Sequence, residues 1–213
     1  MSIKNSIIKE ACVETIQEAI TAEKNGADRI ELCAELKHGG LTPPVDLIES
    51  AQELLTIPLK VLIRPRKGDF IYNKNELAIM EKDIEICKHL DVDEIVIGVL
   101  NADRTIDYPT IVRLSKKAYP MDITFHKAID HTPDIISEVS KLSPIEAIKG
   151  ILTSGGEKTA LVGKEKLKSL VSRYSHRFSI IAAGSITNNN LPKIHKYIKA
   201  NEYHGKKIVG NLN

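Results

Sequence analysis

Short apolar segments alternate with amphipathic segments along this chain of 213 residues. The apolar segments are rich in isoleucine and valine, as buried parallel strands are, except the last and weakest one. They predict strands at 6–13, 28–33, 59–63, 94–100, 122–126, 150–153, 179–183 and 202–204. The segments between them have helical spacing or begin at proline. They predict helices at 14–25, 43–55, 75–90, 109–118, 133–142, 164–175 and 191–200.

Eight strands that alternate with helices favour a closed parallel barrel with right-handed crossovers. A (β/α)₈ barrel needs at least about 200 residues, which this chain provides. The alternative is an open doubly wound sheet, which would want a G-x-G-x-x-G turn after the first strand, where Cys12-Val13-Glu14 stands instead. No linker interrupts the pattern, so we predict one TIM-like barrel over residues 1–213. Only nine residues follow the last strand, and we therefore expect the eighth helix to be missing.

Charge and composition narrow the classes of partner. Thirty Lys and Arg residues against 28 Asp and Glu leave a net charge of +2, which is too balanced for a general nucleic-acid binder. No segment reaches the ~20 apolar residues of a membrane span, and the first residues lack the apolar core of a signal peptide. Three widely spaced cysteines favour reduced thiols. We expect a cytoplasmic protein with neither nucleic-acid nor membrane partners.

Two adjacent strands end in the same pair of side chains, Glu10-x-Cys12 and Glu31-x-Cys33. Alternate residues of a strand share a face, and TIM barrels carry their sites at the carboxyl ends of the strands. The sequence therefore predicts two carboxylates and two thiols at the barrel mouth. Each thiol is interpreted either as a small core residue or as a soft metal ligand.

Basic side chains follow the third predicted strand, at Arg64 and Arg66. A carboxylate inside a barrel needs a partner, because an unpaired buried charge costs several kcal/mol. Planar guanidinium groups match carboxylates, and we expect Arg64 and Arg66 to pair with Glu10 and Glu31. The same two arginines are also candidates for binding the carboxylate or phosphate of a ligand.

Further candidates follow the fifth, sixth and seventh strands. His126 and Asp130 are acid–base groups at a strand end. Ser154, Gly155 and Gly184 stand in tight turns, which either serve the chain reversal alone or bind an anion through backbone N–H groups. The candidate catalytic cluster of an enzyme for a small anionic metabolite then consists of Glu10, Glu31, Arg64, Arg66, His126 and Asp130. Nothing in the sequence identifies the bond made or broken.

Several strings of residues resemble the CutC family of copper homeostasis proteins, in the same order over about residues 6 to 204. They are Glu31-Leu32-Cys33, Gly39-Gly40-Leu41-Thr42-Pro43, Arg64-Pro65-Arg66 with Gly68-Asp69-Phe70 and Tyr72, Thr124-Phe125-His126 with Ala128 and Asp130, and Leu152-Thr153-Ser154-Gly155. The resemblance implies a TIM-like barrel, a cytoplasmic location and a link to copper tolerance. It also implies that Cys12 and Cys33 are copper ligands.

The chain departs from the family pattern at its end. Gly205 follows His204 where Ser or Cys is common, and a longer C-terminal region is missing. We therefore assign no function to the eighth strand at this stage. Lys127 also stands where the family usually has Arg, and Lys67 stands where Gly is common.

Two functional hypotheses follow. The first is a protein that binds Cu(I) through Cys12 and Cys33, and the second is an enzyme for a small carboxylate or phosphate. Without an eighth helix, we expect an uncovered apolar face near the first and last strands, including Ile7 and Ala11. The tail carries only Ile208, Val209 and Leu212 as apolar cover, and we therefore expect a homodimer or a higher homo-oligomer.

Overall fold

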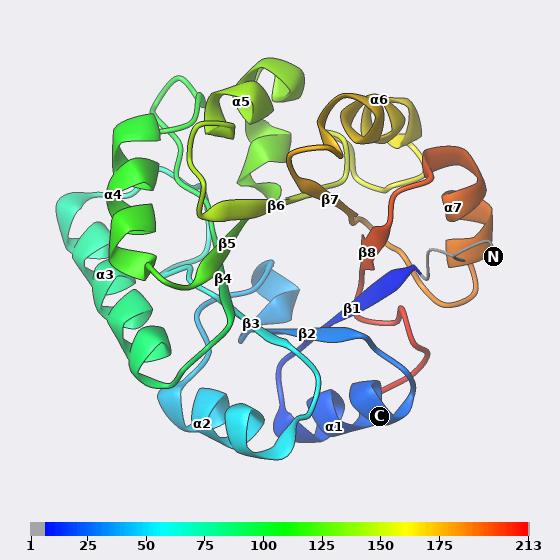
Figure 1. Cartoon of the computed structure of the whole chain (residues 1–213), viewed down its shortest axis with the longest axis horizontal. Helices are drawn as coiled ribbons and strands as arrows, with labels where there is room; N and C mark the ends of the chain where they lie inside the picture. The colour runs from blue at the N-terminus through cyan, green and yellow to red at the C-terminus, as the bar shows by residue number, and fades with distance from the viewer. Residues whose placement is uncertain (1–6, 213) are drawn as a thin grey trace.

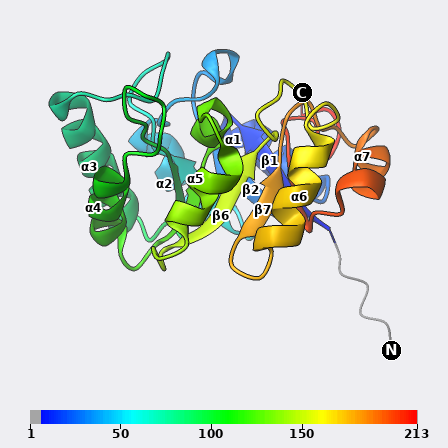
Figure 2. The same ribbon diagram turned by 90° about the horizontal axis from the view of Figure 1, so that it is seen from above.

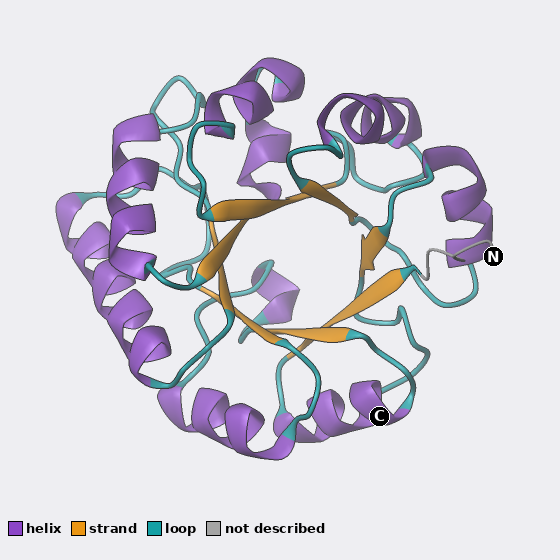
Figure 3. Cartoon of the chain, in the orientation of Figure 1, coloured by secondary structure: helices purple, strands orange, loops and turns teal. Residues whose placement is uncertain are grey.

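Eight parallel strands form a closed barrel in this computed structural model, which describes residues 7–212. Each strand is hydrogen-bonded to its sequence neighbours, and β8 closes the ring on β1 (Figures 1 and 3). The strands are β1 (Ile8–Val13), β2 (Arg29–Leu32), β3 (Leu59–Leu62), β4 (Glu94–Ile97), β5 (Asp122–Phe125), β6 (Ile148–Thr153), β7 (Ser179–Ala182) and β8 (Glu202–His204). The predicted TIM-like barrel is confirmed.

Seven α-helices surround the barrel, and Figure 2 shows α5 and α6 lying over β6 and β7. They are α1 (Ile16–Lys24), α2 (Val45–Leu54), α3 (Lys74–His89), α4 (Tyr108–Ala118), α5 (Ile135–Leu142), α6 (Lys164–Tyr174) and α7 (Leu191–Ile198). Two short 3₁₀ helices, η1 (Leu36–His38) and η2 (Lys127–His131), follow β2 and β5. The predicted boundaries of the strands and helices agree with the observed ones to within three residues. The predicted first strand began at Ser6, which lies outside the described residues.

The two faces of the sheet differ sharply in polarity. Most outward-facing residues of the strands are aliphatic, such as Ile30 and Leu32 in β2, and they pack against the helices to form the main core. The inward-facing residues include Glu31, flanked by two small apolar clusters that fill part of the barrel interior. Burial of the outer apolar face stabilises the barrel. The buried charged side chains of the strands, such as Glu31, lie on the inner face.

The C-terminal tail takes the place of an eighth helix. It runs from β8 towards α1 (red in Figure 1), and the Asn25 side chain donates to the Asn211 carbonyl at 3.4 Å. Ile208 is fully buried and Leu212 is 5% exposed, both within the main core, and Ala11 of β1 is fully buried. The expectation of an uncovered apolar face is therefore wrong, because apolar residues of the tail pack into the main core. The uncovered face was the reason for expecting a homo-oligomer. The homo-oligomer therefore stays a prediction without this support.

None of the helices in residues 7–212 is both long enough and apolar enough to cross a membrane. All three cysteines are buried free thiols.

Candidate functional site

The candidate site is a small cavity at the carboxyl ends of the strands, which we call the mouth cavity. It encloses ≈ 90 Å³, well below the ~300–1,000 Å³ of pockets for drug-sized ligands. Five predicted site residues contribute to its wall. The lining consists of Cys12, Glu31, Cys33, Leu36, Gly39, Gly40, Leu62, Arg64, Phe70, His126, Lys127, Leu152 and His204.

A buried ion cluster lies beneath the mouth cavity, centred on Glu10. The Glu10 carboxylate lies 2.6 Å from Nε of Arg29, 3.4 Å from Nζ of Lys60 and 2.8 Å from Nδ1 of His204. Burial alone would raise the pKa of Glu10, but the charges of Lys60 and Arg29 and the hydrogen bond with His204 hold it well below its usual range. Glu10 is therefore an ionised carboxylate inside the barrel.

The two cations that neutralise Glu10 are shared with other carboxylates. Nζ of Lys60 lies 2.9 Å from Glu94 and donates to the Thr124 hydroxyl at 2.8 Å. Nη2 of Arg29 lies 2.5 Å from Glu202. The side chain of Lys60 is only 2% exposed and is held on every side by these partners. The cluster is a closed network of compensated charges, so we assign it a structural role.

The expectation that Arg64 and Arg66 pair with Glu10 and Glu31 is wrong. The register places Arg29 directly opposite Glu10 across β1 and β2. Arg64 follows the end of β3, four residues beyond the position paired with Glu31. The Arg64 guanidinium donates to the backbone carbonyls of the neighbouring loops instead.

Glu31 and His204 connect the ion cluster to the mouth cavity. Nδ1 of His204 lies 3.6 Å from Oε2 of Glu31, and its ring is also beside Cys12. Burial, reinforced by the nearby charge of Glu10, raises the pKa of Glu31 to about 7. Burial opposes the charged form of His204, but Cys12, Glu31 and Glu10 together raise its pKa well above the usual value. Glu31 can therefore exchange a proton with a ligand near neutral pH.

The thiols of Cys12 and Cys33 both line the mouth cavity, and they share a small apolar cluster with Leu62 and Val96. Cys12 is opposite Glu31 in the register, so Cys33 stands two residues higher. The Cys33 thiol donates to the Val13 carbonyl at 3.4 Å. Burial, and then the nearby carboxylate of Glu31, raise the pKa of Cys33 well above that of a free thiol.

The donor chemistry of the two thiols fits a soft metal ion such as Cu(I). Binding would release the proton of Cys33, since the thiolate is the metal-binding form. Ligand atoms of Glu10, Glu31 and His204 also lie within 4.8 Å of one another. That second group does not fit a metal ion as well, because Arg29 and Lys60 already neutralise Glu10.

Arg64 is 5% exposed and is held by backbone carbonyls. Nη1 donates to His38 at 3.2 Å and to Gly40 at 2.9 Å, and Nη2 donates to Gly68 at 2.8 Å. The guanidinium carbon lies 4.8 Å from the centre of the Phe70 ring, a cation–π contact. Its positive charge therefore faces the mouth cavity without a carboxylate partner among the described residues.

Arg66 differs from Arg64 in both place and partners. Its side chain forms ion pairs with Glu76 at 2.6 Å and with Asp69 at 2.9 Å. Glu76 belongs to α3, outside the barrel. Arg66 therefore fixes the loop after β3 against α3, and it does not line the mouth cavity.

His126 presents a hydrogen-bond donor to the mouth cavity. Its Nδ1 accepts the Ala128 N–H at 3.1 Å, so the neutral ring carries its proton on Nε2. Burial, and then the charge of Arg64, lower the pKa of His126 to about 3, so the ring is neutral at physiological pH. Gly98 makes room for this ring, since a Cβ there would lie 2.4 Å from Cε1 of His126.

Asp130 lies beside the mouth cavity and binds the loop that follows β6. Its carboxylate accepts from the Thr153 hydroxyl at 2.5 Å and from the Gly156 N–H at 2.8 Å, and pairs with Lys127 at 2.6 Å. It also accepts from the N–H and hydroxyl of Ser154. Burial opposes ionisation, but Lys127 and these hydrogen bonds lower the pKa of Asp130. The anion that the turn holds in this structure is therefore an internal carboxylate.

The two glycines predicted to bind an anion differ in their surroundings. The Gly155 N–H donates to the Thr153 hydroxyl at 2.9 Å. Gly184, with φ +105°, lines a neighbouring cavity of ≈ 390 Å³ that shares Cys12, Lys127 and His204 with the mouth cavity. An anion contact from this second cavity stays a prediction.

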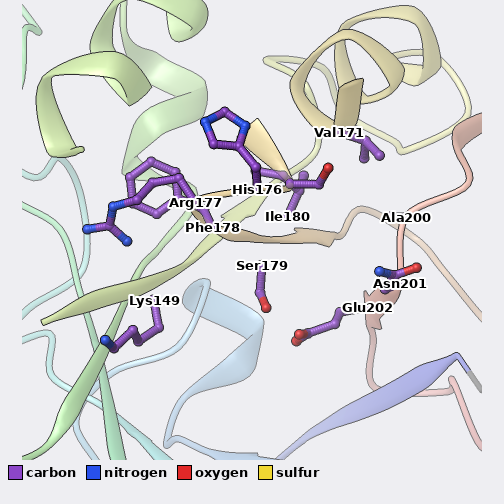
Figure 4. A pocket seen from close by; sticks show the side chains of 11 residues that line it. Lys149, Val171, His176, Arg177, Phe178, Ser179, Ile180, Ala200, Asn201 and Glu202 are labelled. Atoms are coloured by element: carbon purple, nitrogen blue, oxygen red, sulfur yellow. The ribbon is translucent and has the colours of Figure 1, made fainter. Parts of the chain in front are cut away.

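Another cavity, of ≈ 340 Å³, opens at the opposite end of the barrel (Figure 4). Ser179 and Glu202, the first residues of β7 and β8, contribute to its wall together with Lys149 of β6. Because TIM barrels carry their sites at the carboxyl ends of the strands, we assign this cavity no function. Through Glu202 and Arg29 it adjoins the ion cluster.

Sequence reasoning missed the inward-facing residues Arg29, Lys60 and His204. A signal was present, since Arg29 shares a strand face with Glu31, and Lys60 is the charged residue of an otherwise apolar strand. His204 stands at a predicted strand end, but the departures around it led us to assign no function to β8. The register places it next to Glu10, and the structure thereby adds a side chain from β8 to the site.

The fold and the mouth cavity together define a β/α barrel protein with a compact site of thiols, carboxylates and one unneutralised arginine. A family model, the CutC family, matches residues 7–209. The chain is 38% identical over 195 residues to the family protein CutC of Histophilus somni, covering 92% of this chain and 80% of that one. It is 36% identical over 200 residues to the copper homeostasis protein cutC homolog of Homo sapiens, covering 94% and 73%. The chain belongs to the CutC family.

Solved structures agree with this assignment. A copper homeostasis protein CutC from Streptococcus agalactiae superposes with a TM-score of 0.90 at 31% identity, covering 95% of this chain and 99% of that one. A phosphoribosyl anthranilate isomerase from Thermococcus kodakaraensis has a TM-score of 0.63 at 15% identity, covering 95% and 94%. The second likeness concerns the fold alone.

Proposed function

We propose that this chain binds Cu(I) in the mouth cavity through the thiolates of Cys12 and Cys33, in the reducing environment of the cytoplasm. The observation that carries the proposal is that both thiols line one cavity, although they stand on neighbouring strands. Thiolates are soft ligands and favour Cu(I) over hard cations. The copper homeostasis proteins among the relatives support the choice of metal.

Competition for Cu(I) against a chromogenic chelator, without oxygen, tests this proposal. We expect the wild-type chain to take one Cu(I), and Cys12→Ser or Cys33→Ser to lose it. Cys87→Ser is the matched control, because Cys87 is equally buried but lies on α3 in the main core. A Cys12→Ser/Cys33→Ser double variant that still takes one Cu(I) would overturn the proposal.

A second candidate function is an enzyme that acts on a small anionic metabolite. It is favoured by three groups that line the mouth cavity: the Arg64 cation, the His126 Nε2–H donor and the Glu31 carboxyl. A fixed cation and a neutral donor can stabilise negative charge on a ligand. Glu31, with its pKa raised to about 7, is suited to proton transfer near neutral pH.

A further inference from the structure

Buried polar atoms without a hydrogen bond gather in one region of the molecule. Among residues 7–212 they are Oε2 of Glu31, Nε of Arg64, the Tyr72 hydroxyl and Nε2 of His126. Glu31, Arg64 and His126 line the mouth cavity, and Tyr72 is close enough to Arg64 to interact with its charge. Buried polar groups are nearly always hydrogen-bonded in folded proteins, so this concentration points to a polar ligand.

Two of these atoms are donors, and both of their side chains contact the same aromatic ring. The Phe70 ring centre lies 4.8 Å from the guanidinium carbon of Arg64 and 4.9 Å from the centre of the His126 ring. Both side chains are 5% exposed. The donors are therefore held in place, one by backbone carbonyls and the other by the Ala128 N–H.

Arg64 retains capacity for an oxyanion. A guanidinium group has five N–H donors, and backbone carbonyls accept three hydrogen bonds from Arg64. The two that remain are Nε–H, which has no partner among the described residues, and one N–H of Nη2. Guanidinium N–H donors bind carboxylates with charge-assisted hydrogen bonds. Arg29 and Arg66, by contrast, each pair with two carboxylates. The other basic residues that line the mouth cavity also have carboxylate partners, since Lys127 pairs with Asp130 at 2.6 Å and His204 with Glu10 at 2.8 Å. Among the described lining residues, Arg64 is the cation left for a ligand.

His126 requires an acceptor of a different kind. Its Nε2–H is a single neutral donor, which suits a carbonyl or hydroxyl oxygen. The mouth cavity has room for only a small molecule, and Glu31 also lines it. Arg64 offers one positive charge to such a molecule, which suits a ligand with a single negative charge.

We propose that the mouth cavity binds the monoanion of a small 2-oxo carboxylic acid, with the carboxylate on Arg64 and the 2-oxo oxygen on Nε2–H of His126. This inference rests on the second candidate function and names its ligand class. It does not use the two thiols. One such molecule offers a carboxylate for the Arg64 guanidinium and an adjacent oxygen for the single donor of His126.

Calorimetric titration of metal-free protein with pyruvate and with propionate tests the proposal. The two probes share a carboxylate and three carbons, and differ in the 2-oxo oxygen. We expect pyruvate to bind about tenfold more tightly, as one hydrogen bond to a buried donor allows. His126→Phe is expected to remove that ratio and leave propionate binding unchanged, while Arg64→Lys is expected to weaken both probes.

Equal affinity of the wild-type chain for the two probes would overturn the proposal without any variant. So would a ratio that survives His126→Phe, or displacement of pyruvate by an equal concentration of inorganic phosphate. The same titrations on the Cys12→Ser/Cys33→Ser variant separate this inference from copper binding. Loss of Cu(I) with retained pyruvate binding in that variant supports both proposals. A wild-type chain that takes one Cu(I) but binds no pyruvate removes only this one.

Discussion

Replacing Glu10 by alanine is expected to lower the free energy of unfolding by about 3–5 kcal/mol, as breaking a buried ion pair does. Glu10 is fully buried between Arg29, Lys60 and His204. Its removal leaves three cationic side chains in the barrel interior with too little negative charge. The loss comes mainly from this uncompensated charge, because the remaining carboxylates Glu94 and Glu202 were already paired.

Urea unfolding of the wild-type chain and of the variant at neutral pH measures this effect. Glu85→Ala is the control, since Glu85 pairs with Lys117 on the surface of α3 and exposed pairs contribute little. The control is expected to leave the unfolding midpoint in place. A loss of less than ~1 kcal/mol for Glu10→Ala would contradict the assignment of Glu10 as the centre of a buried ion cluster.

Replacing Glu31 by glutamine is expected to change how stability depends on pH. In the folded chain the pKa of Glu31 is about 7, whereas an unfolded glutamate ionises near pH 4.5. Between these values the unfolded state has lost the proton that the folded state keeps, so the contribution of Glu31 to wild-type stability falls as pH rises. Glutamine does not titrate, so this contribution to the pH dependence disappears from the variant.

Between pH 4.5 and 6.5, the difference in stability between the variant and the wild type reports mainly on the titration of Glu31. The pKa of His204 is raised above its usual value, so His204 begins to contribute only above about pH 6.5. Across the window the stability of the variant relative to the metal-free wild type is expected to rise by about 2–3 kcal/mol. Urea unfolding at four pH values measures it. A difference between the two proteins that stays constant with pH would show that Glu31 is not protonated in the folded state.

The sequence was sufficient to predict the barrel because the fold depends on a repeated local pattern. Apolar strands and amphipathic helices alternate, and the outward faces of strands such as β2 and β3 are aliphatic throughout. The residues at strand ends, including Cys12, Cys33 and His126, were found because a barrel fixes which end of each strand carries the site. These three residues do line one cavity.

The pairing of charges could not be predicted, because it depends on register between strands that are distant in sequence. Arg29 reaches Glu10, and His204 of β8 lies opposite the same residue. Arg64 and Arg66 are two residues apart in one motif, yet Arg64 lines the mouth cavity and Arg66 pairs with a helix outside it.

The path of the C-terminal tail could not be predicted from the sequence either. A composition of three apolar residues does not reveal that two of them, Ile208 and Leu212, are buried in the main core. The tail covers the barrel in place of an eighth helix because of tertiary packing, which no local sequence pattern indicates.

The central claim is that Cys12 and Cys33 together hold Cu(I) in the mouth cavity, and the coordination of the metal tests it most directly. X-ray absorption at the copper edge, recorded without oxygen on the chain loaded with one Cu(I), identifies the ligand atoms. Our account predicts a shell of two sulfur atoms, which either single serine variant abolishes and Cys87→Ser leaves unchanged. A shell made of nitrogen and oxygen, or a sulfur shell that persists in Cys33→Ser, would contradict it.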